Sequence, residues 1–173
     1  SHFMQSGVEH LKFERRRELA DKYFLKRLKK NPLKELKDGS FSLDCSGFQF
    51  LPNLNILYNF PIKKADFSAS VLKSLKDLKS WPLESLNLNY TVVDQENYFK
   101  EFKLKELYLR GTKIKGLSKI NEQYLEIIDL PDVHNLLDPL QACPKLRKVI
   151  VPKSVYGKQR IQSLGLTAEI QYR

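Results

Sequence analysis

An apolar pattern recurs every 21 residues along most of this chain, and this period constrains the fold more than any other property of the sequence. The pattern is apolar-x-x-apolar-x-apolar, and four consecutive copies begin at Leu83, Leu104, Leu125 and Leu146. All twelve template positions of these copies are apolar, and nine of them are leucine. A unit of this size cannot bury its apolar side alone, so successive units must stack and share one core.

Two further copies extend the period toward the N-terminus. One lies 21 residues before Leu83, and a degenerate copy precedes that one by 24 residues. Their template positions are Ile62, Ala65 and Phe67, and then Asp38, Phe41 and Leu43. Other apolar residues recur ten and sixteen positions after a copy begins, as in Leu72, Val93 and Ile114 and in Leu78, Phe99 and Ile120. Each repeat therefore predicts a short strand, a turn and a return segment whose apolar residues also point inward.

The copies resemble leucine-rich repeats. Residues 81–88 and 107–114 are similar to a short bacterial subclass whose repeats read Pro-Leu-x-x-Leu-x-Leu-x-Gly-Thr-x-Ile. A polar residue follows the last strand position by three places, and the copies carry Ser46, Ser70, Thr91, Thr112 and Ser154 there, with Val133 in the fifth copy. We expect these hydroxyl groups to bond the backbone of the turn. The resemblance covers roughly residues 38–156, and it implies a tail on a larger bacterial protein, such as a serine/threonine kinase.

By this resemblance, the fold class is an α/β solenoid. The leucine-rich-repeat arc would have a parallel, concave sheet of about six short strands, with turns or 3₁₀ segments on the convex side. We expect residues 1–37 to hold an N-terminal capping helix and residues 38–173 to hold the repeats with a C-terminal cap. Within that cap, residues 158–166 predict a short helix and residues 167–172 a closing edge strand. The first four residues, Ser-His-Phe-Met, resemble the remnant of an expression tag.

The capping segment is strongly basic. Residues 10–37 carry eleven Lys and Arg and four acidic residues, which is +7 of the chain's net charge of +10. Residues 10–30 lack Pro and Gly, and an apolar stripe of Phe13, Ala20, Phe24 and Leu28, with Leu19 and Tyr23 alongside, has helical spacing. Pro32 ends the helix. The sequence thus predicts a helix with one apolar and one basic face, and that basic face is a candidate contact for nucleic acid or an anionic membrane.

The sequence offers little for catalysis. Metal-binding, phosphate-cradling and dinucleotide motifs do not occur in it, and its His and Cys residues do not cluster. Cys45 follows the first predicted strand without a nearby histidine, which favours a turn with a semi-buried thiol over a nucleophile, and Cys143 is expected in the core. We therefore expect no enzymatic activity, no catalytic residue, no cofactor and no metal.

The predicted concave face is the favoured functional surface. Strand residues between the apolar positions point out of the sheet. Near its centre they form a polar patch of mixed charge, the predicted binding residues Asn87, Asn89, Glu106, Tyr108, Arg110 and Asp129. Tyr and Arg are enriched at binding hot spots, which suits a protein or peptide partner.

Three alternatives stay open. The basic helix would contact a polyanion, the patch would be merely solvated, or the chain would pack against an adjoining domain of the same polypeptide. We expect a monomer. The sequence fixes no compartment, and the cytoplasm is the default expectation.

Overall fold

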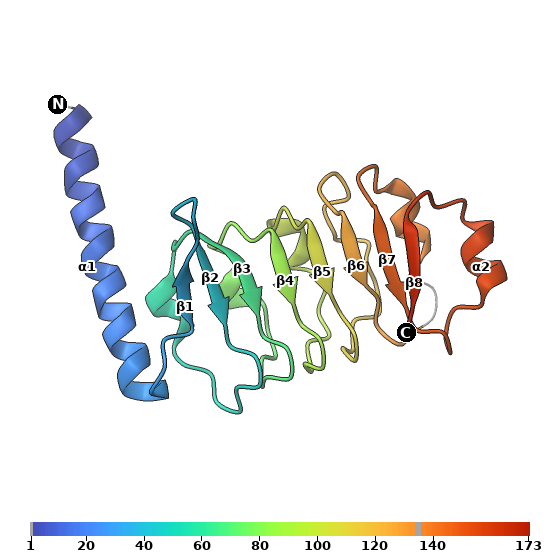
Figure 1. Cartoon of the computed structure of the whole chain (residues 1–173), viewed down its shortest axis with the longest axis horizontal. Helices are drawn as coiled ribbons and strands as arrows, with labels where there is room; N and C mark the ends of the chain where they lie inside the picture. The colour runs from blue at the N-terminus through green and yellow to red at the C-terminus, as the bar shows by residue number, and fades with distance from the viewer. Residues whose placement is uncertain (1, 134–135) are drawn as a thin grey trace.

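A computed structural model describes residues 2–133 and 136–173 and shows an α/β fold. Over these residues, eight short strands form one sheet in chain order, and Figure 1 shows them side by side from α1 at one end to α2 at the other. The strands are β1 (Leu33–Glu35), β2 (Phe41–Asp44), β3 (Ile62–Asp66), β4 (Ser85–Asn87), β5 (Glu106–Tyr108), β6 (Ile127–Asp129), β7 (Lys148–Val151) and β8 (Glu169–Tyr172). β1 pairs with β2 antiparallel, and every later pair is parallel.

The 21-residue period is the register of the sheet. Leu86 lies opposite Leu107, Leu107 opposite Ile128, and Ile128 opposite Val149. All four side chains are fully buried. The sequence prediction of strands at these positions is confirmed, and so is the closing strand, since β8 pairs with β7.

The predicted alignment of the first copy is wrong. Phe41 lies opposite Ile62 and, after an irregularity next to Phe41, Leu43 lies opposite Ala65. The Cys45 N–H donates to the Asp66 carbonyl at 2.8 Å, so buried Cys45 takes the third apolar place that the sequence analysis gives to Leu43. Compared with the next repeat, β2 has one residue fewer between its first two apolar positions, Phe41 and Leu43. The Cys45 thiol serves as the third apolar side chain.

Short 3₁₀ segments, as predicted, lie in four of the connections between strands. They are η1 (Leu54–Leu57), η2 (Lys76–Leu78), η3 (Phe99–Glu101) and η4 (Asp138–Ala142). Leu57, Leu78, Phe99 and Leu140 on these segments are buried in the core. Trp81 is also buried and donates its indole N–H to the Leu57 carbonyl at 2.9 Å.

A column of left-handed residues follows the first four parallel strands. Gly47, Ala69, Tyr90 and Gly111 have φ between 53° and 69°. Behind this column the Thr91 and Thr112 hydroxyls each donate at 2.8 Å to the carbonyl of the leucine just after a strand, and the Ser70 oxygen accepts from the Leu72 N–H. These three bonds confirm the predicted role of the hydroxyl. Ser46 differs because its hydroxyl donates to the Asp44 carboxylate, a consequence of the shifted first copy.

The N-terminal helix is longer than predicted. α1 spans His2–Leu28 rather than residues 10–30, and Lys29 leaves it in the left-handed region at φ 56°. Ala20 and Phe24 are buried, and Phe13 packs on Phe41 and Phe60. Leu19, expected beside the apolar stripe, is 60% exposed, because the stripe that docks on the core faces the other side of the helix. At the other end lies α2 (Lys158–Ser163), within the predicted helix. None of the described helices is long and apolar enough to cross a membrane.

Candidate binding surface on the sheet

The predicted binding residues lie on three adjacent strands. Asn87 on β4 is opposite Tyr108 on β5, which is opposite Asp129 on β6. Glu106 lies beside Ser85, and Asn89 and Arg110 follow the ends of β4 and β5. We call the sheet side that carries these residues the polar face. The structure brings all six together there, in the middle of the sheet (Figure 1).

Asp129, however, is not open to a partner. Its side chain is 2% exposed, and one carboxylate oxygen accepts from Arg110 Nε and Nη2 at 3.1 and 3.0 Å. The other oxygen accepts from Arg173 Nε at 3.0 Å. In earlier repeats the equivalent side chain accepts from the backbone N–H two residues on. Pro131 has no N–H, so the Asp129 carboxylate bonds the two guanidinium groups instead. The structure thus buries Asp129, one of the predicted binding residues, beneath Arg110 and Arg173.

The other predicted residues are half-buried and held by hydrogen bonds. Glu106 accepts from the Ser85 hydroxyl at 3.1 Å and from the Tyr108 hydroxyl at 3.4 Å. Burial, and then the nearby Glu106 carboxylate, raise the pKa of Tyr108. The phenol therefore stays a proton donor over the physiological range. Asn89 accepts from the Arg110 N–H at 2.7 Å, which ties β4 to β5 beyond the strand ends.

A ladder of side-chain turns stiffens the N-terminal part of the polar face. Asp44, Asp66 and Asn87 each accept from the backbone N–H two residues on, at 2.8 to 3.0 Å. The Asn87 amide also donates to Asp66 at 3.2 Å, across the two strands. Side chains fixed in this way lose little further conformational freedom when a partner binds.

A depression of about 360 Å³ opens above this ladder, over β2 to β5. We call it the polar hollow. Its lining side chains come from Ser42, Asp44, Lys64, Asp66, Ser85, Asn87 and Tyr108. Of the predicted residues, Asn87 and Tyr108 lie in this lining. The pairing of Asp44 with Asp66 could not be expected from the predicted alignment of the first copy, which sets Ser42 beside Asp66.

An alternating charge ladder, which was not among the sequence predictions, runs along the start of the strands. Lys63, Glu84, Lys105, Glu126 and Arg147 follow one another at 21-residue intervals with alternating sign. Ion pairs join Lys63 to Asp38 at 2.7 Å, Lys105 to Glu84 at 2.8 Å and Arg147 to Glu126 at 3.3 Å. Hydrogen bonds to the partner carboxylates raise the pKa of Lys63 and Lys105. The sequence contains a detectable sign of this ladder, because the charge alternates in sign at every 21st residue.

Two basic residues of α1, and Lys30 just after it, contact the body of the protein. Arg17 pairs with Glu35 at 2.8 Å and lies over the Phe41 ring. Arg16 donates to the Tyr58 carbonyl and lies over the Phe60 ring, and Lys30 lies over Phe48. These three cations help to hold the helix against the repeats, although Arg16 and Lys30 stay exposed.

The thiols of Cys45 and Cys143 are not activated as nucleophiles. Both cysteines are free and buried. Burial raises the pKa of Cys45 to about 12 and that of Cys143 to about 11. A thiol with such a pKa is almost wholly protonated at neutral pH and is a poor nucleophile. Among residues 2–133 and 136–173, no group of three or more His, Cys, Asp or Glu residues is arranged to bind a metal ion.

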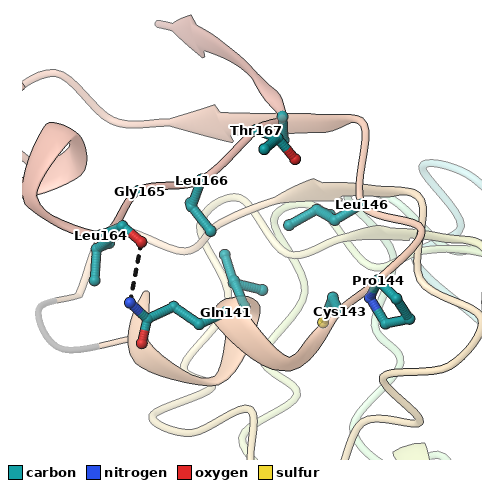
Figure 2. Close-up of a pocket in the computed structure, with 10 residues that line it drawn as sticks. Gln141, Cys143, Pro144, Leu146, Leu164, Gly165, Leu166 and Thr167 are labelled. Atoms are coloured by element: carbon teal, nitrogen blue, oxygen red, sulfur yellow. Dashed lines mark hydrogen bonds between the residues drawn. The ribbon is translucent and has the colours of Figure 1, made fainter.

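A second, smaller depression of about 280 Å³ lies near the C-terminus and is lined by both apolar and polar groups. Figure 2 shows Leu146 and Leu166 beside it, from either side of the gap between η4 and the segment that leads to β8. The Gln141 amide donates to the Leu164 carbonyl at 3.0 Å and bridges that gap.

The polar face as a whole offers fixed hydrogen-bond donors and acceptors around one exposed hollow. That arrangement can bind a complementary surface. No family model, curated protein or solved structure matches this chain.

Proposed function

We propose that this chain is a leucine-rich-repeat solenoid of the short bacterial type, and that it binds a protein or peptide without catalysing a reaction. The 21-residue register of the sheet, the left-handed residue after four strands and the threonine hydroxyls behind it support the family. On this view the polar face is the concave side of the arc.

The polar hollow is the observation that carries the proposed binding. It presents serine hydroxyls, an asparagine amide, two carboxylates, one lysine and the Tyr108 phenol within about 360 Å³. This variety of donors and acceptors suits a peptide segment, whose backbone and side chains need both. Tyr108 supplies a rigid, half-buried aromatic of the kind that anchors interfaces.

Charge favours a protein over a polyanion at this face. Asp44, Asp66 and Glu106 outnumber Lys64 around the hollow, and Arg110 is neutralised by Asp129. A phosphate backbone would be repelled there. Part of the positive charge of α1 is already used within the protein, because Arg16 binds the Tyr58 carbonyl and Arg17 pairs with Glu35.

A random-peptide display library tests the proposal. Peptides selected on the wild-type chain should lose binding to a variant with Asp66→Ala and Tyr108→Ala. Tyr58→Ala is the matched control, because it also removes a tyrosine side chain, but Tyr58 is 61% exposed and lies outside the hollow. Thermal unfolding of all three proteins shows whether they fold. Selected peptides that bind the hollow variant as well as the wild type would refute the proposed site.

A further inference from the structure

The segments that follow β3, β4 and β5 form a second exposed face of the repeats. In residues 69–73, 90–94 and 111–115 the first, third and fifth residues are exposed, and the two between them are buried. Backbone hydrogen bonds join neighbouring segments, since the Tyr90 N–H donates to the Arg110 carbonyl at 2.6 Å and the Lys113 N–H to the Val93 carbonyl at 3.1 Å. Because the three strands are parallel, their ends lie at the same edge of the sheet (Figure 1). We call the exposed side of these three segments the turn face.

The turn face exposes a patch of apolar side chains. Tyr90 is 60% exposed, Val92 47% and Val71 38%, and exposed Ala69 precedes Tyr90 by one repeat. These four residues are neighbours, because each repeat advances the chain by one strand spacing and they occupy the first and third places of two adjacent segments. A contiguous apolar patch on a surface marks an interaction site.

Tyr90 has a backbone conformation that does not suit its side chain. Its φ is 60°, in the left-handed region, where Gly111 holds the same place in the next repeat. A bulky residue in this region carries backbone strain, which persists at functional sites. The ring lies against Gly111, where an added Cβ would come within 2.6 Å of it, yet most of the side chain stays exposed. Burial in the core therefore does not explain the tyrosine, and contact with a ligand outside the protein would.

Lysines surround the apolar patch. Lys73 ends the first segment, and Lys113 and Lys115 take the third and fifth places of the last one. Asp94 is the one acidic residue of the three segments, so three lysines and one aspartate give them a net charge of +2. Among the ion pairs of residues 2–133 and 136–173, none engages these four side chains. By contrast, ion pairs balance the charge ladder at the start of the strands.

The end of α1 adds cations at the same edge. Lys29 and Lys30 are exposed and follow the last residue of α1. The Lys30 Nζ lies 4.8 Å from the centre of the Phe48 ring, and the Phe48 carbonyl accepts from the Val71 N–H at 3.0 Å. Exposed Asp44 at the end of β2 offsets one of these two charges. Figure 1 shows the C-terminal end of α1 on this side of the sheet.

We propose that the turn face binds the surface of a membrane that contains anionic lipids. Tyr90 and the two valines enter the headgroup layer, where the amphipathic ring of a tyrosine is favoured. The lysines of the turn face, together with those at the end of α1, lie at the level of the lipid phosphates and are attracted to them. This binding is separate from the polar hollow and does not depend on the peptide binding proposed there.

A lipid surface fits the turn face better than a protein partner does. The apolar patch is only two residues by two, whereas a stable protein interface buries roughly 800 Å² on each partner. A few apolar groups combined with electrostatic attraction are enough for reversible membrane binding. The cations are also all lysines, whose ammonium groups suit a layer of spread negative charge, while a single fixed carboxylate is better matched by the planar fork of arginine.

Co-sedimentation with lipid vesicles tests the proposal. We expect the chain to bind vesicles of equal parts phosphatidylserine and phosphatidylcholine, to bind phosphatidylcholine alone weakly, and to be released as salt rises. Lys113→Gln combined with Lys115→Gln should weaken binding to the anionic vesicles about 25-fold, at about fivefold for each charge near the surface. Lys76→Gln combined with Lys100→Gln is the matched control. These exposed lysines lie on η2 and η3, outside the turn face, and their loss should leave binding nearly unchanged.

Tyr90→Gly tests the apolar part of the contact. Glycine suits the left-handed backbone at this place, so the variant should unfold at the same or a higher temperature than the wild type and yet bind the anionic vesicles more weakly. Tyr58→Ala is the control, because it removes a tyrosine of similar exposure outside the turn face and should bind like the wild type.

A fluorescent label shows which surface meets the lipid. Val92→Cys carrying an environment-sensitive dye should shift its emission to shorter wavelength on the anionic vesicles, whereas Lys100→Cys with the same dye should not. The native thiols are buried and give little background labelling. Absence of binding to the anionic vesicles at low salt, or binding that neither turn-face variant weakens more than its control does, would overturn the proposal.

Discussion

Arg110 donates through both Nε and Nη2 to the same oxygen of Asp129, at 3.1 and 3.0 Å, while Arg173 reaches the other oxygen from 44 residues away. The Asp129 side chain is 2% exposed, so the carboxylate at the centre of this ion cluster is shielded from solvent. It fastens β5, β6 and the C-terminus together. Removing one member leaves the opposite charge without a partner in a poorly solvated place.

Asp129→Asn is therefore expected to destabilise the fold. The change keeps the size of the side chain but removes the charge that balances two guanidinium groups. We expect the free energy of unfolding to fall by about 3 kcal/mol, as for one broken buried ion pair. Urea denaturation measures it. Asp132→Asn is the control, because that side chain is 48% exposed and should change stability by less than about 1 kcal/mol.

Glu96→Leu should stabilise the protein. Glu96 Oε2 is buried and has no hydrogen-bond partner among the described residues. Leucine occupies the equivalent place in neighbouring repeats, as Leu75 and Leu117, and both are buried. Relieving one unsatisfied polar atom and adding apolar contact should raise the free energy of unfolding by about 1 to 2 kcal/mol. Glu122→Leu, at an exposed position in the next repeat, should raise it much less; an equal gain would contradict this explanation.

Gly111→Ala should cost stability for two reasons. Gly111 has φ 67°, and an added Cβ would come within 2.6 Å of the Tyr90 ring. We expect a loss of roughly 1 to 2 kcal/mol from the left-handed backbone alone. Thermal unfolding checks the sign. Ala69→Gly at the equivalent turn, with φ 53°, should instead stabilise by about 0.5 kcal/mol, since backbone strain relieved there exceeds the entropy lost by glycine.

The cysteines should resist alkylation while the protein is folded. Burial raises the pKa of Cys45 to about 12 and that of Cys143 to about 11, so both thiols stay protonated at pH 8. Because the pKa is higher in the folded state, the resulting stability is present below the ordinary thiol pKa. It is lost as the pH rises toward 11 and 12. Iodoacetamide labelling followed by mass spectrometry should show slow reaction at pH 8 and complete reaction in urea. Rapid labelling of native protein would contradict the buried, protonated thiols.

Much of the fold could be predicted because one repeat corresponds to one strand spacing. When the chain advances 21 residues, Leu86, Leu107 and Ile128 come to lie side by side, so a period in the sequence is a period in space. The alternation of strand side chains then assigns Asn87 and Tyr108 to the polar face. The register failed at the first copy, where a one-residue irregularity beside Phe41 breaks the spacing on which the prediction depends.

The sequence by itself thus determined the strands of the regular repeats, their buried side and the class of α/β fold. Tertiary structure alone decided that Arg173 covers Asp129, that Asp44 lies beside Asp66, and that Leu19 faces away from the core. The physical reason is that a period records which residues share a face of one repeated unit. It carries no information about which side chain from a distant or irregular segment comes to rest on that face.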